Sequence, residues 1–450
     1  MRFFLSAVFL FVTTACGAQE KQPAWKAGAS SAVITPKTMM WMAGYAARTK
    51  PAEGVAMDLF AKSLVLDDGQ SGPLAMITVD LVSIPRSVRL AAAERIEKEH
   101  GIPPERLLIN ASHTHCGPEL REWRSKETDD RERRVREAQE YCEFLVGTFS
   151  KLVGEALAKR TAVVVDYTHA RCGFAMNRRR PTATGYQNAP WPGGPVDHRV
   201  PVLRVVDQGS KTPVAIVFGY ACHCTVLSWQ KFSGDYAGAA QAFLESQHPG
   251  AVALFMNGCS GDQNPYPRRD PEQAEAHGRT LGLAVQSALD TPPKVLSGRI
   301  QAALKEIPLR LERTPTKPEL EERAKSSDKL DAGLAKRLLE RLNAGQELMK
   351  DYPYPVQVIR LGDELTLVAL GGEVVVDYSL RLQRELEDPV VWVAGYSNDV
   401  MTYIPSWRVW EEGGYEGADA MKWNDFPARW HPGLEEEIVG AVKEVRGRLK

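Results

Sequence analysis

The segment between residues 75 and 110 limits the possible folds of this chain more than any other part. Residues 75–84 form an apolar, β-branched run that predicts a buried strand, residues 87–100 predict a helix, and residues 107–110 predict a second strand. A strand, a helix and another strand within about 35 residues predict a crossover unit. We therefore expect an α/β fold, with a mixed β-sheet core and flanking helices in a single large domain.

Other short β-branched runs extend this expected sheet. They are separated by loops rich in Gly and Pro, and they cover residues 163–167, 200–206, 214–218, 252–256, 355–360 and 365–370. The loop at 177–199 is long and rich in Arg, Pro and Gly, which is typical of functional or disordered loops. Residues 317–349 are charged with helical periodicity and predict a helical insertion, and residues 433–449 predict a closing helix.

The charge balance favours a small-molecule partner. The 450 residues include 56 basic and 57 acidic side chains, for a formal net charge of -1. A chain this close to neutral has no bulk electrostatic attraction for nucleic acid or an anionic membrane surface. The sequence does not indicate the oligomeric state.

The first residues have the pattern of a secretory signal. A basic start at Arg2 precedes an apolar run over residues 3–12 and a small-residue exit that includes Cys16 and Ala18, which is too short to span a bilayer. We expect a signal peptide over residues 1–18 and export to the periplasm or the extracellular space. Thr13 favours cleavage after Ala18 over a lipid anchor on Cys16, and no other run is long enough for a transmembrane helix.

Six cysteines remain after Cys16, and four of them lie in or beside the motifs described below. Export permits disulfides, but a chain of this length does not need them to form a core. Thiolate ligation of zinc is a further alternative. Because no Cys-x-x-Cys pair occurs, we favour small buried cysteines.

The segment Ser112–Pro118 is the best single indication of chemistry. It places His113 and His115 directly after the apolar run 107–109. If the strand continues through them, both rings point to the same face, because side chains alternate along a strand. Neutral imidazole is the commonest metal ligand, and a site at the end of a strand can be open to substrate.

Other polar groups also follow predicted strands. His223 comes after the run 214–218, Glu373 after 365–370, and Tyr403 lies in the polar segment that follows residues 390–394. A hydrolytic zinc site usually has about three protein ligands and an open position, so the two clustered histidines need further partners. Asp80, Asp235 and Asp262 are expected to fix loops or caps at least as readily as to bind a ligand.

Taken in order, these motifs resemble the catalytic domain of the neutral/alkaline non-lysosomal ceramidases. The resemblance covers roughly residues 25–445, and we assign 25–450 to this domain, with the insertion at about 317–349. It is carried by Ala32–Pro36, Met42–Tyr45, His113–Pro118, Asn177–Arg178, His223–Thr225, Ser233–Asp235, Gly261–Pro265, Gly372–Glu373 and Asn398–Tyr403.

The resemblance implies a zinc amidohydrolase that cleaves an N-acyl lipid such as ceramide to a fatty acid and a sphingoid base. Carried over by position, the Zn²⁺ ligands are His113, His223, Glu373 and Tyr403. His115 and Arg178 become oxyanion-stabilising or supporting catalytic groups, and Asn264 occupies the position of the active-site serine. The identity of the general base is open between His115 and a carboxylate.

Three departures from the family pattern bear on this expectation. Asn264 cannot act as a nucleophile, although attack by water does not require one. Val400 replaces the first tyrosine of the Asn-x-Tyr-x-x-Tyr motif, which leaves Tyr403 as the candidate ligand there. The sequence ends at Lys450, and from this we expect the immunoglobulin-like C-terminal domain of full-length relatives to be absent.

Two other functions fit the same residues. The zinc site could hydrolyse another amide or ester, such as an N-acylated amino sugar or a different lipid. The chain could also be a binding protein that keeps the fold without turnover. Substrate identity and acyl-chain length are open in each case.

Overall fold

The computed structural model describes residues 25–121 and 130–449, and it contains the predicted crossover unit. Strand β3 (Leu74–Val79), helix α1 (Arg86–His100) and strand β4 (Leu107–Ala111) follow one another, and the two strands pair in parallel. Both strands are buried along their whole length, so their apolar runs lack the alternation of a strand with one wet face. The expected signal peptide and Cys16 lie outside the described residues.

This unit forms one edge of a large mixed sheet. The strand order is β11-β10-β9-β5-β1-β2-β3-β4, with β13 paired to β5. Only β3 with β4 and β10 with β11 are parallel neighbours among the described strands of this sheet. Its remaining strands are β1 (Lys26–Val33), β2 (Phe60–Asp67), β5 (Thr161–Arg171), β9 (Arg199–Asp207), β10 (Pro213–Tyr220), β11 (Val252–Asn257) and β13 (Lys294–Val295).

A second, smaller sheet stacks on the large one. It has the order β14-β15-β16-β18, and its strands are β14 (Ile300–Arg310), β15 (Asp351–Leu361), β16 (Leu365–Leu370) and β18 (Val391–Ala394). One hydrophobic cluster joins the two sheets, because Leu64 and Leu108 of the large sheet pack with Leu367 and Trp392 of the small one. The α/β class with a mixed sheet and flanking helices is therefore confirmed, in an arrangement with two stacked sheets.

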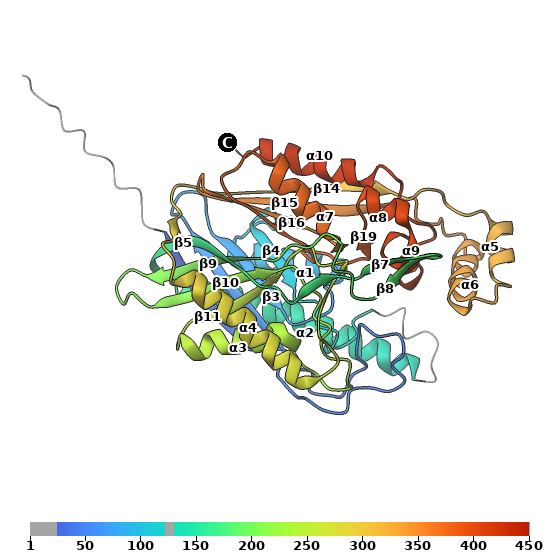
Figure 1. Cartoon of the computed structure of the whole chain (residues 1–450), viewed down its shortest axis with the longest axis horizontal. Helices are drawn as coiled ribbons and strands as arrows, with labels where there is room; N and C mark the ends of the chain where they lie inside the picture. The colour runs from blue at the N-terminus through green and yellow to red at the C-terminus, as the bar shows by residue number, and fades with distance from the viewer. Residues whose placement is uncertain (1–24, 122–129, 450) are drawn as a thin grey trace, which may run out of the picture.

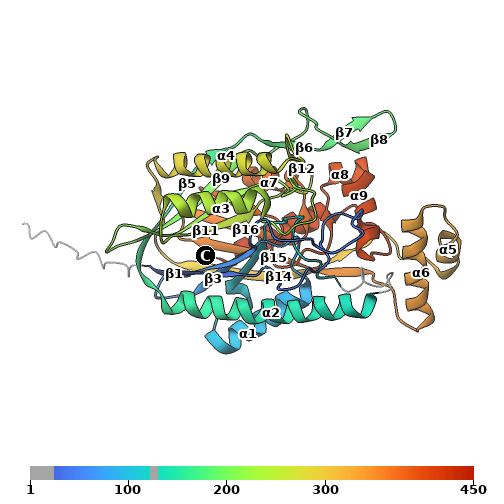
Figure 2. The same cartoon turned by 90° about the horizontal axis from the view of Figure 1, so that it is seen from below.

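Helices cover the outer faces of both sheets and give a four-layer α/β/β/α molecule (Figure 1). On the large sheet lie α1, α2 (Arg131–Ala158), α3 (Asp235–Gln247) and α4 (Pro271–Leu289). In Figure 2, which views this layer from below, α2 runs along one side and α3 and α4 along the other. On the small sheet lie α7 (Val376–Glu385) and α10 (Leu434–Gly447).

The helical insertion lies at one end of the molecule (Figures 1 and 2). Helices α5 (Lys317–Arg323) and α6 (Lys329–Asn343) pack on each other around a small apolar cluster of their own. They are attached to the domain by Asp425, which accepts hydrogen bonds from Arg337 at 2.9 Å and Arg341 at 2.8 Å. No helix among the described residues is both long and apolar enough to cross a membrane.

The long loop at 177–199 is more ordered than its composition suggests. It contains a β-hairpin of β7 (Arg179–Thr182) and β8 (Gly185–Asn188). Just before it, β6 (Ala175–Asn177) pairs with β12 (Gln263–Pro265), which carries Asn264. The hairpin contacts the short helices α8 (Trp407–Glu412) and α9 (Gly414–Gly417), so this loop forms one wall of the region described next.

Candidate metal centre

Strand ends from both sheets converge on one buried point. Strands β4, β10 and β11 of the large sheet and β16 and β18 of the small sheet all end beside it, and the loops that follow them meet there. Asn110 joins them, because its side-chain amide donates to the carbonyl of Gly395 at 2.8 Å and accepts from the backbone N–H of Asn257 at 2.8 Å. The expectation of a site at strand ends is thus supported by the topology.

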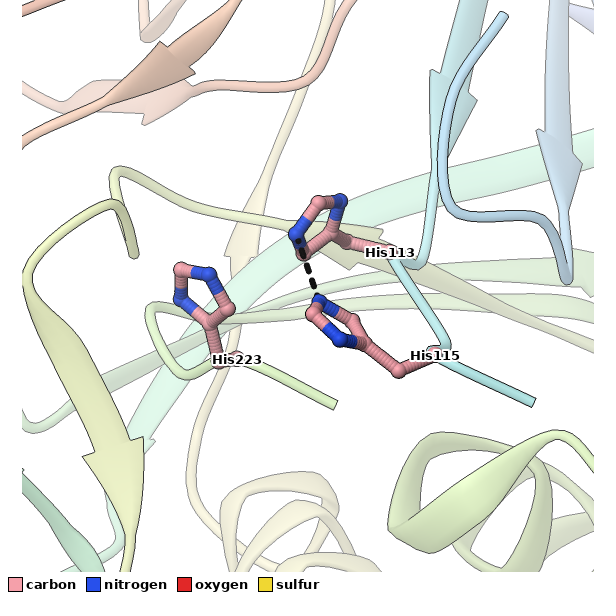
Figure 3. A group of neighbouring side chains, drawn as sticks. All are labelled: His113, His115 and His223. Carbon is pink, nitrogen blue, oxygen red and sulfur yellow. Dashed lines mark hydrogen bonds between the residues drawn. The ribbon is translucent and has the colours of Figure 1, made fainter. Parts of the chain in front are cut away.

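The backbone that brings His113 and His115 together is not the extended strand that the sequence predicts. Strand β4 ends at Ala111, and His113 has a φ of 63°, in the left-handed region that non-glycine residues rarely adopt. The alternation argument is therefore wrong, since these residues are not extended strand. The left-handed turn still brings the two rings together, with their Nε2 atoms 3.1 Å apart (Figure 3). Such strain is concentrated at functional sites.

Two short strands bring Glu373 and Tyr403 to the same point. Glu373 begins β17 (Glu373–Val374) and Tyr403 begins β19 (Tyr403–Ile404), and these residues are direct partners in a parallel pair. His223 follows the end of β10 and is fully buried. The Glu373 carboxylate oxygen Oε2 lies 3.2 Å from Nε2 of His113 and 3.3 Å from Nε2 of His223. The Tyr403 hydroxyl lies 3.3 Å from the same His223 nitrogen.

The hydrogen bonds of the two histidines turn an Nε2 lone pair of each ring toward this point. Nδ1 of His113 lies 2.6 Å from the carbonyl of Val82, and Nδ1 of His223 lies 2.6 Å from the carbonyl of Ser260. A carbonyl only accepts, so the proton of each neutral ring is on Nδ1 and each Nε2 presents a lone pair. Both lone pairs face a carboxylate oxygen that is buried without a hydrogen-bond partner. Three acceptors that face one another need a positive charge between them, which a metal ion or a proton on one imidazole supplies.

The spacing of these atoms fits a tetrahedral metal ion. Nitrogen and oxygen ligands lie about 2.0–2.1 Å from zinc, so neighbouring ligand atoms of a tetrahedral site are about 3.3–3.4 Å apart. The separations of 3.2 and 3.3 Å from Glu373 to the two imidazoles match this value. An Nδ1–H bonded to a carbonyl is also the usual way in which a metal-ligating histidine is oriented. The residues present therefore fit a metal ion of the zinc type.

His115 differs from the other two histidines. The ring nitrogens of His113, His115 and His223 all lie within 4.8 Å of one another, and this group could hold a metal ion (Figure 3). However, Nδ1 of His115 is buried without a hydrogen-bond partner, so nothing fixes its tautomer as carbonyls fix the other two. Its ring contacts Tyr45, with ring centroids 4.8 Å apart. Its Nε2 is the atom that can carry a proton toward the centre.

Arg178 and Asn264 are hydrogen-bonded to each other beside Tyr403. Arg178 is buried, and it donates to the Tyr403 hydroxyl at 2.8 Å, to Oδ1 of Asn264 at 3.2 Å and to Glu416 at 2.7 Å. Asn264 donates in turn to the side chain of Asn188 on β8 at 3.2 Å. These contacts favour the supporting role for Arg178 over a direct contact with an oxyanion.

The two residues that follow Arg178 differ in burial. Arg179 is buried and donates to Glu416 at 2.6 Å and to Glu412 at 3.1 Å. Arg180 is exposed and donates to Gln187 at 2.8 Å. Glu416 therefore links two buried guanidinium groups, one of which touches Tyr403.

Burial and charge set the protonation of the centre. Burial lowers the pKa of His223 to about 3, with a further contribution from Arg178, and burial also holds the pKa of His115 well below its ordinary value. Burial opposes ionisation of Glu373, but the positive charge that His113 and His223 carry when protonated outweighs burial and holds the pKa of this carboxyl well below the usual range. Neutral imidazoles and an ionised carboxylate are the forms that bind metal.

Two tyrosines at the centre are missed by sequence reasoning. The Tyr396 ring lies 4.5 Å from the His113 ring, and the Tyr396 hydroxyl is buried without a hydrogen-bond partner. Tyr415 of α9 packs against Tyr403 with ring centroids 5.3 Å apart. Tyr396 comes before the Asn-x-Tyr-x-x-Tyr segment, so comparison with that motif does not select it. Tyr415 lies after the motif and belongs to no motif of its own, so the sequence does not indicate that it reaches the centre.

The aspartates and cysteines around the centre have structural roles. Asp235 accepts from the backbone N–H of Leu227 and Asp262 from that of Val376, each at 2.9 Å. Asp80 accepts from the N–H of Phe60 at 3.0 Å. The cysteines are free thiols in the described part of the chain, and all are buried except the half-buried Cys142, in agreement with the sequence interpretation.

This fold and this site define a class, namely a large α/β enzyme with a histidine and carboxylate centre buried at strand ends. The family model for the N-terminal part of neutral/alkaline non-lysosomal ceramidase matches residues 25–270, more than half of the chain. The chain belongs to the neutral/alkaline non-lysosomal ceramidase family. It is accordingly a hydrolase of that family, and the resemblance seen in the sequence is confirmed.

Solved structures share the fold. The neutral ceramidase from Pseudomonas aeruginosa aligns with a TM-score of 0.73 and 18% sequence identity, over 95% of this chain and 74% of that one. A ceramidase complexed with C2 aligns with the same TM-score and 17% identity, over 95% of this chain and 75% of its own. At these identities the agreement concerns the fold.

Proposed function

We propose that this protein is a zinc-dependent amidohydrolase that cleaves the amide bond of an N-acyl lipid such as ceramide. The overall reaction adds water across the C–N bond, so that the acyl half leaves as a fatty acid and the other half as a free amine. The observation that carries the proposal is the Glu373 oxygen that faces two imidazole lone pairs at 3.2 and 3.3 Å. Family membership supplies the reaction class.

His113, His223, Glu373 and Tyr403 would hold the metal. When bound, a zinc ion supplies Lewis-acid chemistry, which polarises an amide carbonyl and makes water more acidic. Arg178 supports this set, because its hydrogen bond to the Tyr403 hydroxyl orients the phenol, and its charge offsets part of the burial that raises the pKa of Tyr403. Zinc is a metal that this mixed nitrogen and oxygen donor set suits.

His115 is the residue we assign to proton transfer. Its Nε2 lies 3.1 Å from Nε2 of His113, so its proton is held at the edge of the centre. The leaving amine needs a proton, and a neutral imidazole close to the reacting bond can deliver one and take one from water. Asn264 has no nucleophilic role in this scheme. Its amide is engaged by Arg178, Thr225 and Asn188.

The test separates holding the metal from transferring the proton. In H113A, metal analysis of the freshly purified protein should show loss of the ion, since one imidazole ligand is gone. In H115A, we expect about one metal ion per chain and a rate on ceramide at least 100-fold below the parent. His248 contacts Gln286 on α4, so H248A is the matched control and should keep both metal and rate.

Three outcomes would contradict the proposal in different ways. Less than about one metal ion per chain in the parent protein would refute the metal site. Loss of metal in H115A would make His115 a ligand and refute the division of roles. Retained metal with no hydrolysis of any amide or ester would favour a binding protein on this fold.

We also propose that the protein is exported, because residues 1–18 have the pattern of a signal peptide. Fractionation of producing cells should place the mature chain in the periplasm or medium, with an N-terminus at Gln19. A mature N-terminus at a lipid-modified Cys16 would contradict cleavage after Ala18 and establish the lipid anchor.

A further inference from the structure

A small cavity lies apart from the metal centre, between helix α1 and the edge of the small sheet. Its volume is about 190 Å³. This is several times the roughly 30 Å³ that one water molecule occupies, and it is below the roughly 300–1,000 Å³ of drug-sized sites. The cavity therefore has the size for a small organic molecule. It is lined by α1, by strands β14 and β15, and by the segments around Pro104 and Asn398.

Part of the lining is aliphatic. Leu90 and Ala93 contribute to it from α1, Leu304 from β14 and Pro355 from β15. Hydrocarbon surfaces of this kind favour an apolar group over water, because contact between them removes apolar area from solvent. One part of a bound molecule is therefore expected to be aliphatic.

Two buried groups of opposite charge, Arg89 and Asp399, line the same cavity. Arg89 is 5% exposed and Asp399 is 2% exposed. Burial lowers the pKa of Arg89 to about 10 and raises the pKa of Asp399 to about 6, so both groups are charged at pH 8. The other buried contact of opposite charges in the lining is self-contained, because Arg86 and Glu306 bond to each other at 2.6 and 2.8 Å.

Arg89 and Asp399 each keep one polar atom for a ligand. Nε of Arg89 donates to Oδ1 of Asn398 at 3.1 Å, and Nη2 donates to two backbone carbonyls at 2.9 and 3.3 Å. Oδ2 of Asp399 accepts from the Tyr352 hydroxyl at 2.6 Å. In the described part of the chain, neither Nη1 of Arg89 nor Oδ1 of Asp399 has a hydrogen-bond partner, and neither atom is fully enclosed.

The two charges call for a ligand that carries both signs. A buried charge that is bonded to neutral groups alone is costly, and an opposite charge beside it offsets that cost. Exposed Glu94 and Glu97 of α1 stand at the rim of the cavity, and they disfavour a ligand with a net negative charge. A molecule with one positive and one negative group meets both conditions.

We infer that this cavity binds an α-amino acid with an aliphatic side chain. Its carboxylate accepts from Nη1 of Arg89, its ammonium group donates to Oδ1 of Asp399, and its side chain packs against the aliphatic part of the lining. An α-amino acid joins these three features within a molecule small enough for the cavity.

The cavity is distinct from the metal centre. None of the proposed metal ligands lines it. The two sites are connected through the backbone, because the N–H of Gly372, which precedes Glu373, donates to the carbonyl of Asp399 at 2.7 Å. Binding of an amino acid in the cavity therefore requires neither the metal nor amide hydrolysis.

Three probes with the same hydrocarbon branch test the inference by calorimetric titration of the full chain at pH 8. L-leucine carries both charges, leucinamide lacks the carboxylate, and 4-methylpentanoate lacks the ammonium group. We expect saturable binding of L-leucine, and dissociation constants at least about tenfold higher for the other two probes.

Variants of the lining place the ligand. In D399N the ammonium group loses its ionic partner, so the difference between L-leucine and 4-methylpentanoate should shrink to less than about threefold. A93L fills the cavity and should abolish binding of L-leucine. Ala91 is exposed on the same helix and is not part of the lining, so A91L is the matched control and should bind L-leucine as the parent does.

Each contrary result overturns the inference. Absence of saturable L-leucine binding to the parent refutes it outright, and equal binding of L-leucine and leucinamide refutes the role of Arg89. Equal effects of A93L and A91L refute the placement, and if A93L fails to fold, an unchanged probe difference in D399N does so. H113A should bind L-leucine as the parent does, whereas loss of binding in H113A would place the ligand at the metal centre.

Discussion

At the scale of single residues, Gly44 shows how closely the site is packed. It has a φ of 91°, and a Cβ atom at this position would lie 2.4 Å from Cγ of His115. Two independent constraints, backbone conformation and space for the imidazole, therefore require glycine here.

We expect G44A to displace the His115 ring, to lower kcat at least tenfold and to keep the metal. Gly250 has nearly the same φ, 93°, and a Cβ atom added there would have no neighbour within 4 Å. G250A therefore carries the same backbone strain, about 1–2 kcal/mol, without the collision. Steady-state rates and metal analysis of both variants provide the test, and equal rates in the two variants would contradict the role of Gly44.

At the scale of secondary-structure elements, ion pairs connect α9 to the start of the β7–β8 hairpin. One of the paired arginines, Arg178, also donates a hydrogen bond to Tyr403. Glu416 of α9 accepts from Arg178 at 2.7 Å and from Arg179 at 2.6 Å. Burial opposes ionisation of Glu416, but the two arginines outweigh it and hold its pKa below the ordinary value. Glu416 is thus a positioning residue for Arg178.

The E416Q variant should leave one oxygen to accept from the two buried arginines and should remove the charge that balances them, at a cost of about 3 kcal/mol in the free energy of unfolding. We expect kcat to fall more than KM changes, because the orientation of Tyr403 is affected. Glu412 bonds to Arg179 and Arg408, so E412Q tests the same wall without touching Arg178. An equal loss of kcat in E412Q would show that the effect is general to the wall.

The same elements show what sequence can and cannot predict. The crossover unit and the insertion are encoded locally, by uninterrupted apolar runs such as β3 and by helical periodicity, and both are predictable. The stacking of two sheets is not, because Leu108 and Leu367 meet across the interface although the sequence shows only that each is apolar. The sequence points to His113 but with the wrong local geometry, since nothing in Ser112–Pro118 signals a left-handed residue.

At the scale of the whole molecule, buried carboxyl groups make stability depend on pH. Burial raises the pKa of Asp80 to about 6, against the opposing effect of Lys62. The folded state therefore binds this proton more tightly than the unfolded state, whose pKa is 3.8. This group stabilises the fold less as the pH rises from about 4 to about 6, and the full penalty applies above about 6.

D80N removes this titration. Relative to the parent, its free energy of unfolding should improve by up to about 3 kcal/mol between about pH 4 and pH 7, because only the parent ionises a buried carboxyl. Urea unfolding at several pH values measures the difference. A constant difference across this range would show that Asp80 titrates alike in the folded and unfolded chain.

The convergence of two sheets on one centre has a consequence for how the protein matures. His113 and His223 follow strands β4 and β10 of the large sheet, whereas Glu373 and Tyr403 lie on the two-stranded pair β17 and β19 in the later part of the chain, so neither half of the chain holds the complete set of proposed ligands. Metal binding would then require that the two halves have docked, and its free energy would stabilise the docked state. The ion would then link the half of the chain that is synthesised first to the half that is synthesised later.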